Sequence, residues 1–219
     1  MTIAKRNKIT NYISKDNIIV RHIKNNLREY IIISIIFLIG VIIGVIFINN
    51  LKENQQDIIN VYLNNFIESI KNENQIDNVE LLKTSIISNI KLCLYLSIAG
   101  LTVIGIPILY IIICYRGFCL GYTISAAIAS LGIKNGSLFI ISTIFLQNLI
   151  IIPCIFFLTI SGMKLYKTIV KEKKKENIKL EIIRHAIFSV IILIFLIIAS
   201  FVETYISTVL FIKISNYLY

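Results

Sequence analysis

The chain has 219 residues, of which 57% are hydrophobic and 16% are charged, and its formal net charge is +10. Soluble domains are about half apolar and a quarter charged, so this composition indicates an integral membrane protein and argues against a soluble globular domain. The four cysteines all lie within or at the end of apolar runs, at spacings that match neither a disulfide framework nor a zinc site.

The first 29 residues form a basic tail that contains seven Lys and Arg. Arg21, Lys24 and Arg28 share one face of a helix, and apolar residues share the other. This pattern is typical of an amphipathic helix that lies on an anionic membrane surface. A solvated tail explains the same charges equally well, and the sequence leaves both interpretations open.

Five apolar stretches follow, and they predict an all-α fold: a polytopic bundle of five transmembrane helices within one membrane domain. A transmembrane helix needs about 20 apolar residues. The first stretch is followed by polar residues rather than by a small-residue cleavage site, which indicates an uncleaved anchor. The predicted spans cover residues 30–48, 90–114, 117–133, 138–163 and 186–212.

Three segments connect these predicted spans. Residues 49–89 are expected to form an extracytoplasmic segment with two short amphipathic helices, either a binding surface or a connector on the membrane. Tyr115 and Arg116 alone separate the second and third spans, which predicts a tight turn, with Arg116 either a topology charge or a contact residue. Residues 164–185 are expected to form a basic loop.

The basic residues are distributed unevenly between the two sides of the predicted bundle. The tail, Arg116 and the 164–185 loop hold 16 Lys and Arg, whereas the opposite side holds 6. Cytoplasmic segments carry an excess of Lys and Arg, so the N terminus is predicted to be cytoplasmic and the C terminus extracytoplasmic. The charge is thereby explained by membrane topology, and no nucleic-acid partner is expected.

Small residues form a strip along the third predicted span. Such a strip lets another helix backbone approach closely, so Gly117 and Gly121 are expected to serve packing. Gly40 and Gly44 form a GxxxG pattern in the first span, which is a weaker signal of the same kind. The strip consists of residues four apart: Gly117, Gly121, Ser125 and Ala129.

Polar groups and a proline interrupt the last two spans. Gln147 and Asn148 lie near the middle of the fourth span, and Pro153 removes a helix hydrogen bond after them. The amides are expected to bond neighbouring helices of the bundle, or to anchor a partner's helix or line a cavity. Glu203 is expected near the outer end of the fifth span, where Lys91 is a candidate partner.

No motif for catalysis or for a cofactor is present. The sequence lacks HExxH, GxxxxGK[ST] and GxGxxG patterns. His22 and His185 are expected to be ordinary interfacial residues, and the intramembrane polar residues form no recognised catalytic set. We therefore expect a protein that is not an enzyme and that binds no metal or cofactor.

Three motifs resemble those of the stage II sporulation protein M (SpoIIM) family: RGFCLGY at 116–122, QNLIIIP at 147–153 and ASFVETYIS at 199–207. The resemblance covers most of the chain. It implies a membrane scaffold in the mother-cell septal and engulfing membrane of endospore formers. It also implies two partners, a SpoIIP-like amidase/endopeptidase and a SpoIID-like lytic transglycosylase, which the scaffold recruits to remodel peptidoglycan.

Two other functions and the oligomeric state are left open by the sequence. A small transporter or channel subunit is the alternative, favoured by the intramembrane amides, the prolines and Glu203. An intramembrane enzyme is the weakest interpretation because catalytic groups are lacking. The residues that are candidates for structure or partner contact are Arg116, Gly117, Gly121, Gln147, Asn148, Pro153 and Glu203. A homo-oligomer is compatible with the sequence.

Overall fold

The computed structural model describes residues 23–71, 78–102, 104–171, 175–207 and 209–210, and these residues form helices and no strand. Two of the elements, η1 and η2, are π-helical segments. In chain order the elements are α3 (Leu27–Asn49), α4 (Glu53–Lys71), α5 (Asn78–Leu101), α6 (Gly105–Phe139), η1 (Ile140–Phe145), α7 (Leu146–Lys171), α8 (Lys175–Phe201) and η2 (Val202–Ser207).

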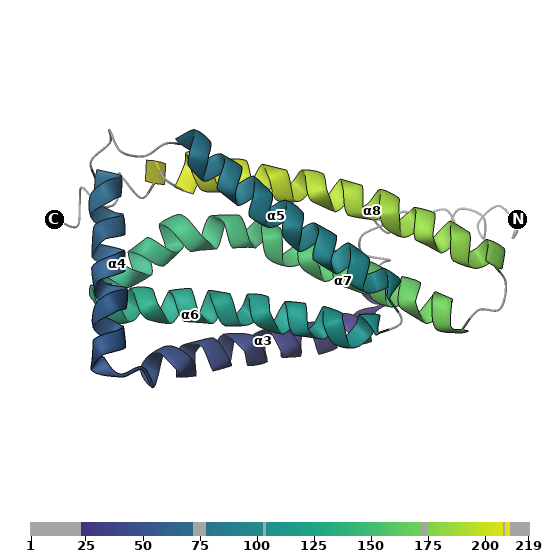
Figure 1. Ribbon diagram of the computed structural model, residues 1–219, viewed down its shortest axis with the longest axis horizontal. Coiled ribbons are helices and arrows are strands. Elements are labelled where there is room, and N and C mark those ends of the chain that lie inside the picture. The colour runs from purple at the N-terminus through teal and green to yellow at the C-terminus, as the bar shows by residue number, and fades with distance from the viewer. Residues whose placement is uncertain (1–22, 72–77, 103, 172–174, 208, 211–219) are drawn as a thin grey trace, which may run out of the picture.

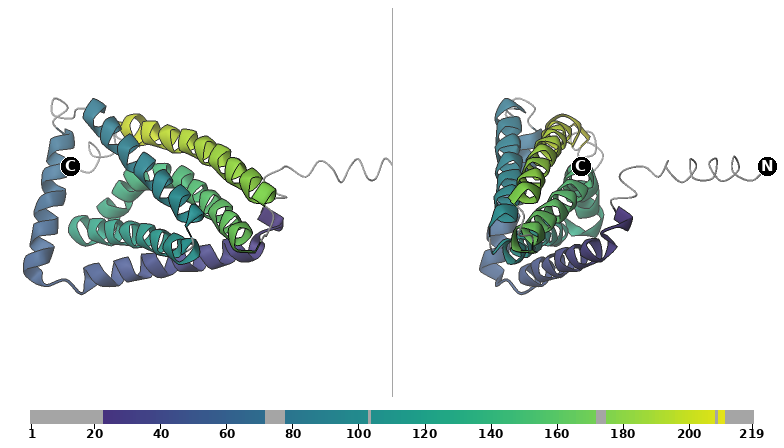
Figure 2. Two further views of the ribbon diagram at one scale, coloured as in Figure 1. Left: turned by 45° about the vertical axis from the view of Figure 1, so that its right-hand side comes forward. Right: turned by 90° about the vertical axis from the view of Figure 1, so that its right-hand side faces the viewer.

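Long helices run side by side along the molecule, and α4 lies across one end of them (Figure 1). We call this the α4 end, and we call the opposite end, where α7 finishes, the Lys171 end. The two further views in Figure 2 also place α4 across the helix ends. Helix α3 packs along α6, while α5, α7 and α8 pack against one another.

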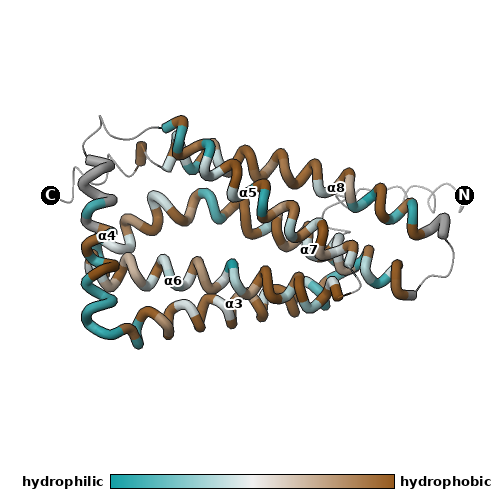
Figure 3. Tube along the Cα trace, in the orientation of Figure 1, coloured by the Kyte–Doolittle hydropathy of each residue, from teal (hydrophilic) through white to brown (hydrophobic). Residues whose placement is uncertain are grey.

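Within the described residues, four helical stretches are long and apolar enough to cross a membrane: Leu27–Asn49, Asn78–Leu101, Gly105–Val170 and Ile178–Ser207. Hydrophobic residues dominate these helices, whereas α4 alternates between polar and apolar residues (Figure 3). The third stretch has 66 residues. As a straight helix it would be about 99 Å long, roughly three times the thickness of a bilayer core.

This third stretch reverses direction at Gly132. The glycine has φ 77° and ψ 168° inside an otherwise helical segment, a conformation that residues with a Cβ rarely adopt. Gly136 then lies against the backbone of Ala127 and Ile128, where a Cβ atom would be crowded. As a result α6 runs toward the α4 end and α7 returns (Figure 1). The reversal at Gly132 lies inside the predicted third span, 117–133, and not in the expected connection at 134–137.

The core is formed mainly by the middle parts of α5 to α8. Leu96, Leu109, Leu158 and Leu196 are fully buried within it. Helix α3 instead exposes a stripe of large apolar side chains at helical spacing, including Ile31, Ile35, Leu38, Ile42 and Ile46. Soluble proteins rarely present such a continuous stripe to water, so this face of α3 is suited to contact with lipid or with another protein.

The predicted turn at Tyr115 and Arg116 is wrong. Helix α5 ends at Leu101, and α6 begins at Gly105 and continues through both residues. The sequence placed Gly105 and Pro107 inside a span. Proline is tolerated in the first turn of a helix, where its missing N–H has no helical partner, so this pair starts α6.

The two predicted polar segments are shorter than expected. Helix α5 already begins at Asn78, so the apolar residues from Leu82 onward belong to it and not to a separate amphipathic helix. The expected loop 164–185 is mostly helical, because α7 extends to Lys171 and α8 starts at Lys175. Lys and Glu are good helix formers, which favours these extensions. The predicted helix of the N-terminal tail falls largely outside the described residues.

Candidate functional site: a polar seam between α5 and α8

Between residues 85 and 97, helix α5 carries a polar or sulfur-containing side chain at every fourth position, on the side that packs against the bundle. Because residues four apart lie on one face of a helix, they form a continuous line along α5. We call this line and its partners on α8 and η2 the polar seam. Its α5 members are Ser85, Asn89, Cys93 and Ser97.

The middle of the seam is a buried amide. The side chain of Asn89 is 4% exposed. Its Nδ2 donates to the hydroxyl of Ser200 at 2.8 Å and to the carbonyl of Leu196 at 3.3 Å. Such interhelical hydrogen bonds stabilise membrane bundles by about 0.6–2 kcal/mol each, so this contact fixes α5 against α8.

At the α4 end the seam finishes on the carboxylate of Glu203. The hydroxyl of Ser85 donates to this carboxylate. The side-chain nitrogen of Gln147, with its amide turned toward Glu203, donates to the two carboxylate oxygens at 2.7 and 2.9 Å. Glu203 thereby joins three separate parts of the chain: α5, α7 and η2.

Arg116 supplies a positive charge to the same region. It is half-buried in α6, and Glu203 interacts with it electrostatically. An isolated charge within a bilayer is expensive, and an opposite charge within electrostatic range reduces that cost. The cluster of Arg116, Gln147, Ser85 and Glu203, which we call the Glu203 cluster, therefore has a formal charge of zero.

Two π-helical segments meet beside this cluster. Glu203 lies in η2, Gln147 follows η1 by two residues, and the two segments contact each other. Thr204 and Ser207 of η2 are almost completely buried, and no partner for their hydroxyls is found in the described part of the chain. Short π-helical segments occur frequently at functional sites.

At the Lys171 end the seam finishes on His185. The imidazole Nδ1 lies 2.9 Å from the hydroxyl of Ser161, and Nε2 lies 3.4 Å from the carbonyl oxygen of Ser97. If Nε2 carries the proton and donates to Ser97, Nδ1 accepts the hydroxyl proton of Ser161. His185 is buried, so its expected position as an interfacial surface residue is wrong.

The other residues that the sequence singled out near the polar groups lie outside the seam. The side-chain nitrogen of Asn148 donates to the carbonyl of Ile144, one helical turn earlier, at 2.8 Å. Pro153 is exposed within α7. Lys91 is exposed on α5, and the contacts described for Glu203 join it to Ser85 and Gln147. A pairing between Lys91 and Glu203 stays a prediction.

The glycines of α3 and α6 form a close backbone contact. A Cβ atom added to Gly117 or Gly121 would overlap backbone atoms of Phe37 or Val41 in α3. Added to Gly40 or Gly44, it would overlap the backbone of α6. Both glycine pairs thus lie in one helix–helix contact. Ala129 is exposed, so the strip of small residues ends at Ser125.

The seam could have been found from the sequence, but its partners could not. Polar residues at every fourth position of 85–97 are visible as a pattern once α5 is known to start at Asn78. The partners on α8 lie about 100 residues away. Their pairing depends on the antiparallel packing of two helices, which sequence spacing does not specify.

Comparison with known families gives a match over most of the chain. The family model described as stage II sporulation protein M matches residues 33–208. The chain belongs to this family. Membership implies a sporulation-related membrane protein. Comparison with curated proteins and with solved structures gives no match.

The three motifs that resemble this family converge in space. Arg116 from the first, Gln147 from the second and Glu203 from the third all belong to the Glu203 cluster. The described residues contain no group of three His, Cys, Asp or Glu side chains that could hold a metal ion. The hydrogen bonds of this arrangement tie α5, α7 and η2 together at the half-buried carboxylate of Glu203, and Arg116 of α6 interacts with that carboxylate electrostatically.

Proposed function

We propose that the protein is a non-enzymatic membrane scaffold that places peptidoglycan hydrolases at the septal and engulfing membrane during endospore formation. The observation that carries the proposal is the family match over residues 33–208. The family is not known as a catalytic one. The partners would be an amidase/endopeptidase and a lytic transglycosylase, as the resemblance of the motifs implies.

In this proposal the chain crosses the membrane five times, because Gly105–Val170 is two spans joined at Gly132. Seven basic residues lie in positions 1–29 and eight in positions 164–185. The start of α3 and the end of α7 both lie at the Lys171 end (Figure 1). The positive-inside rule then makes this end cytoplasmic and the α4 end extracytoplasmic.

Helix α4 is the proposed docking surface for the hydrolases. Ile58, Val61 and Tyr62 lie on one face of it and are 69%, 58% and 70% exposed. Ile59 and Leu63 are half-buried on another face. The spans can turn their apolar side chains toward lipid, but α4 lies across the span ends. An exposed apolar stripe there, with a tyrosine in it, fits the apolar, aromatic-rich core of a protein interface.

Affinity capture from detergent-solubilised membranes of sporulating cells tests the proposal. One tagged variant replaces Ile58, Val61 and Tyr62 with serine. The matched control replaces Glu53, Gln56 and Asp57, exposed polar residues of the same helix, with serine. We expect the wild type and the control to recover both hydrolases and the apolar variant to lose them. Recovery of neither enzyme by correctly inserted wild-type protein would refute the scaffold function.

A small transporter or channel subunit is the second candidate, and the Glu203 cluster favours it. Ionisable residues within membrane spans commonly mark substrate or ion pathways. Purified protein in liposomes separates the two functions. Ion flux that the substitution Glu203→Gln abolishes would favour transport, whereas sealed liposomes would favour the scaffold.

A further inference from the structure

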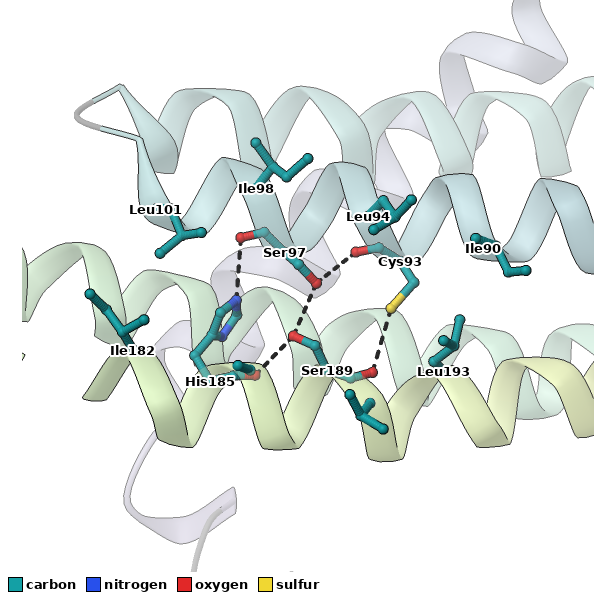
Figure 4. Close-up of a pocket in the computed structure, with 12 residues that line it drawn as sticks. Ile90, Cys93, Leu94, Ser97, Ile98, Leu101, Ile182, His185, Ser189 and Leu193 are labelled. Carbon is teal, nitrogen blue, oxygen red and sulfur yellow. Dashed lines mark hydrogen bonds between the residues drawn. The ribbon is translucent and has the colours of Figure 1, made fainter. Parts of the chain in front are cut away.

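A cavity of about 280 Å³ lies between α5 and α8, beside the His185 end of the polar seam (Figure 4). We call it the α5–α8 groove. Side chains of both helices line it, and most of them are aliphatic, such as Leu94, Ile98 and Val190. These three side chains are also exposed on the outer surface of the bundle, so the groove lies next to the lipid.

The polar residues in the groove wall are already bonded to one another. The hydroxyl of Ser97 lies 2.7 Å from the carbonyl of Cys93 and 3.0 Å from the hydroxyl of Ser189. Ser189 donates to the carbonyl of His185 at 2.8 Å, and the His185 ring contacts Ser161 and Ser97. The dashed lines in Figure 4 follow most of these contacts. The groove therefore offers an occupant almost only carbon, which selects an apolar ligand over a polar solute.

The size of the groove indicates which apolar ligand it accepts. One turn of a helix, about 10 Å across and 5.4 Å long, occupies about 420 Å³, which is more than the whole cavity of about 280 Å³. A hydrocarbon chain is narrow enough, and it is the most abundant apolar group around a membrane helix. Inside the bilayer this chain is already out of water, so van der Waals contact with the groove walls, rather than transfer from water, would hold it there. An acyl chain therefore fits both the shape and the chemistry.

A positive charge lies at one end of the groove. On α8 the groove is lined by Ile182, Ala186 and Ser189. Lys179 is exposed and precedes Ile182 by three residues, so it continues the same helical face toward the Lys171 end. Residues 164–185 contain eight basic and three acidic side chains. Basic side chains at the membrane surface attract anionic headgroups.

We propose that the α5–α8 groove binds one acyl chain of an anionic phospholipid whose phosphate is held by Lys179. This site is separate from the docking surface on α4 and does not depend on the scaffold function. It makes anionic lipid a structural ligand of the α5–α8 pair.

Photocrosslinking tests the acyl-chain part of the proposal. The full-length protein is placed in nanodiscs that contain phosphatidylglycerol with a diazirine in its acyl chain, and crosslinked peptides are identified by mass spectrometry. Ala186→Phe fills the groove, and Ile187→Phe adds the same ring to the adjacent exposed position that does not line it. We expect crosslinks to groove residues that Ala186→Phe removes and Ile187→Phe preserves. Equal crosslinking of both variants would show only general lipid contact and would overturn the proposal.

Native mass spectrometry tests the headgroup part without disturbing packing. We expect Lys179→Gln to weaken retention of phosphatidylglycerol about fivefold, the usual effect of one basic residue near the surface. Lys91→Gln, which removes an exposed charge from α5 away from this end of the groove, should leave retention unchanged. Equal retention of phosphatidylglycerol and phosphatidylcholine by the wild type would refute a charge-selective site.

Discussion

Substitution of Gly121 by leucine should separate α3 from α6. The first side-chain atom already overlaps the backbone of Val41, and backbone cannot move aside as a flexible side chain can. Overpacking usually lowers the free energy of unfolding by about 1–3 kcal/mol. We expect the upper end of this range because a shift of α3 also loosens the contacts at Gly40, Gly44 and Gly117. A loss of about 3 kcal/mol lowers the folded-to-unfolded ratio roughly a hundredfold.

The matched control is Ala129→Leu, which adds a leucine to an exposed position on the same helix, eight residues farther on. Steric-trapping measurements in bicelles give the free energy of unfolding of both variants, and a cysteine pair across α3 and α6 reports their separation. Equal stability of the two variants, with the cysteine pair still forming a disulfide, would refute the close backbone contact.

Three further predictions concern polar contacts. A double-mutant cycle of Asn89→Leu and Ser200→Ala should give a coupling of about 0.6–1.7 kcal/mol in the free energy of unfolding, and zero coupling would contradict the bond between them. Glu203→Leu should lower that free energy by about 1.5–3 kcal/mol, and adding Arg116→Leu should restore part of the loss; an additive double variant would argue against their interaction. Lys167→Gln breaks a partly exposed ion pair with α3, so its effect should stay below about 1 kcal/mol and vanish at high salt, which thermal denaturation at two salt concentrations would show.

The helical class and the apolar stretches were predictable from composition, because only long apolar helices place so many isoleucines in lipid. The turn between α5 and α6 was not, since the apolar pattern continues through residues 102–104 without a polar break. Arg116 looked like a loop charge because it interrupts the apolar run, and Glu203, with which it interacts electrostatically, is 87 positions away in the sequence. The first half of α5, residues 78–89, likewise looked too polar to belong to the bundle until its partners on α8 and η2 were known.

The polar seam also determines how α5 and α8 can move. Apolar helix faces tolerate axial sliding, because one leucine replaces another with little loss. In the seam, by contrast, the amide of Asn89 meets the hydroxyl of Ser200, and the hydroxyl of Ser85 meets the carboxylate of Glu203, each at a particular level. A slip of one helical turn, about 5.4 Å, would leave these groups unpaired within the membrane. The seam thus acts as a register lock, comparable to a buried asparagine in a coiled coil, and any rearrangement of this pair would have to proceed by rotation or separation rather than by sliding.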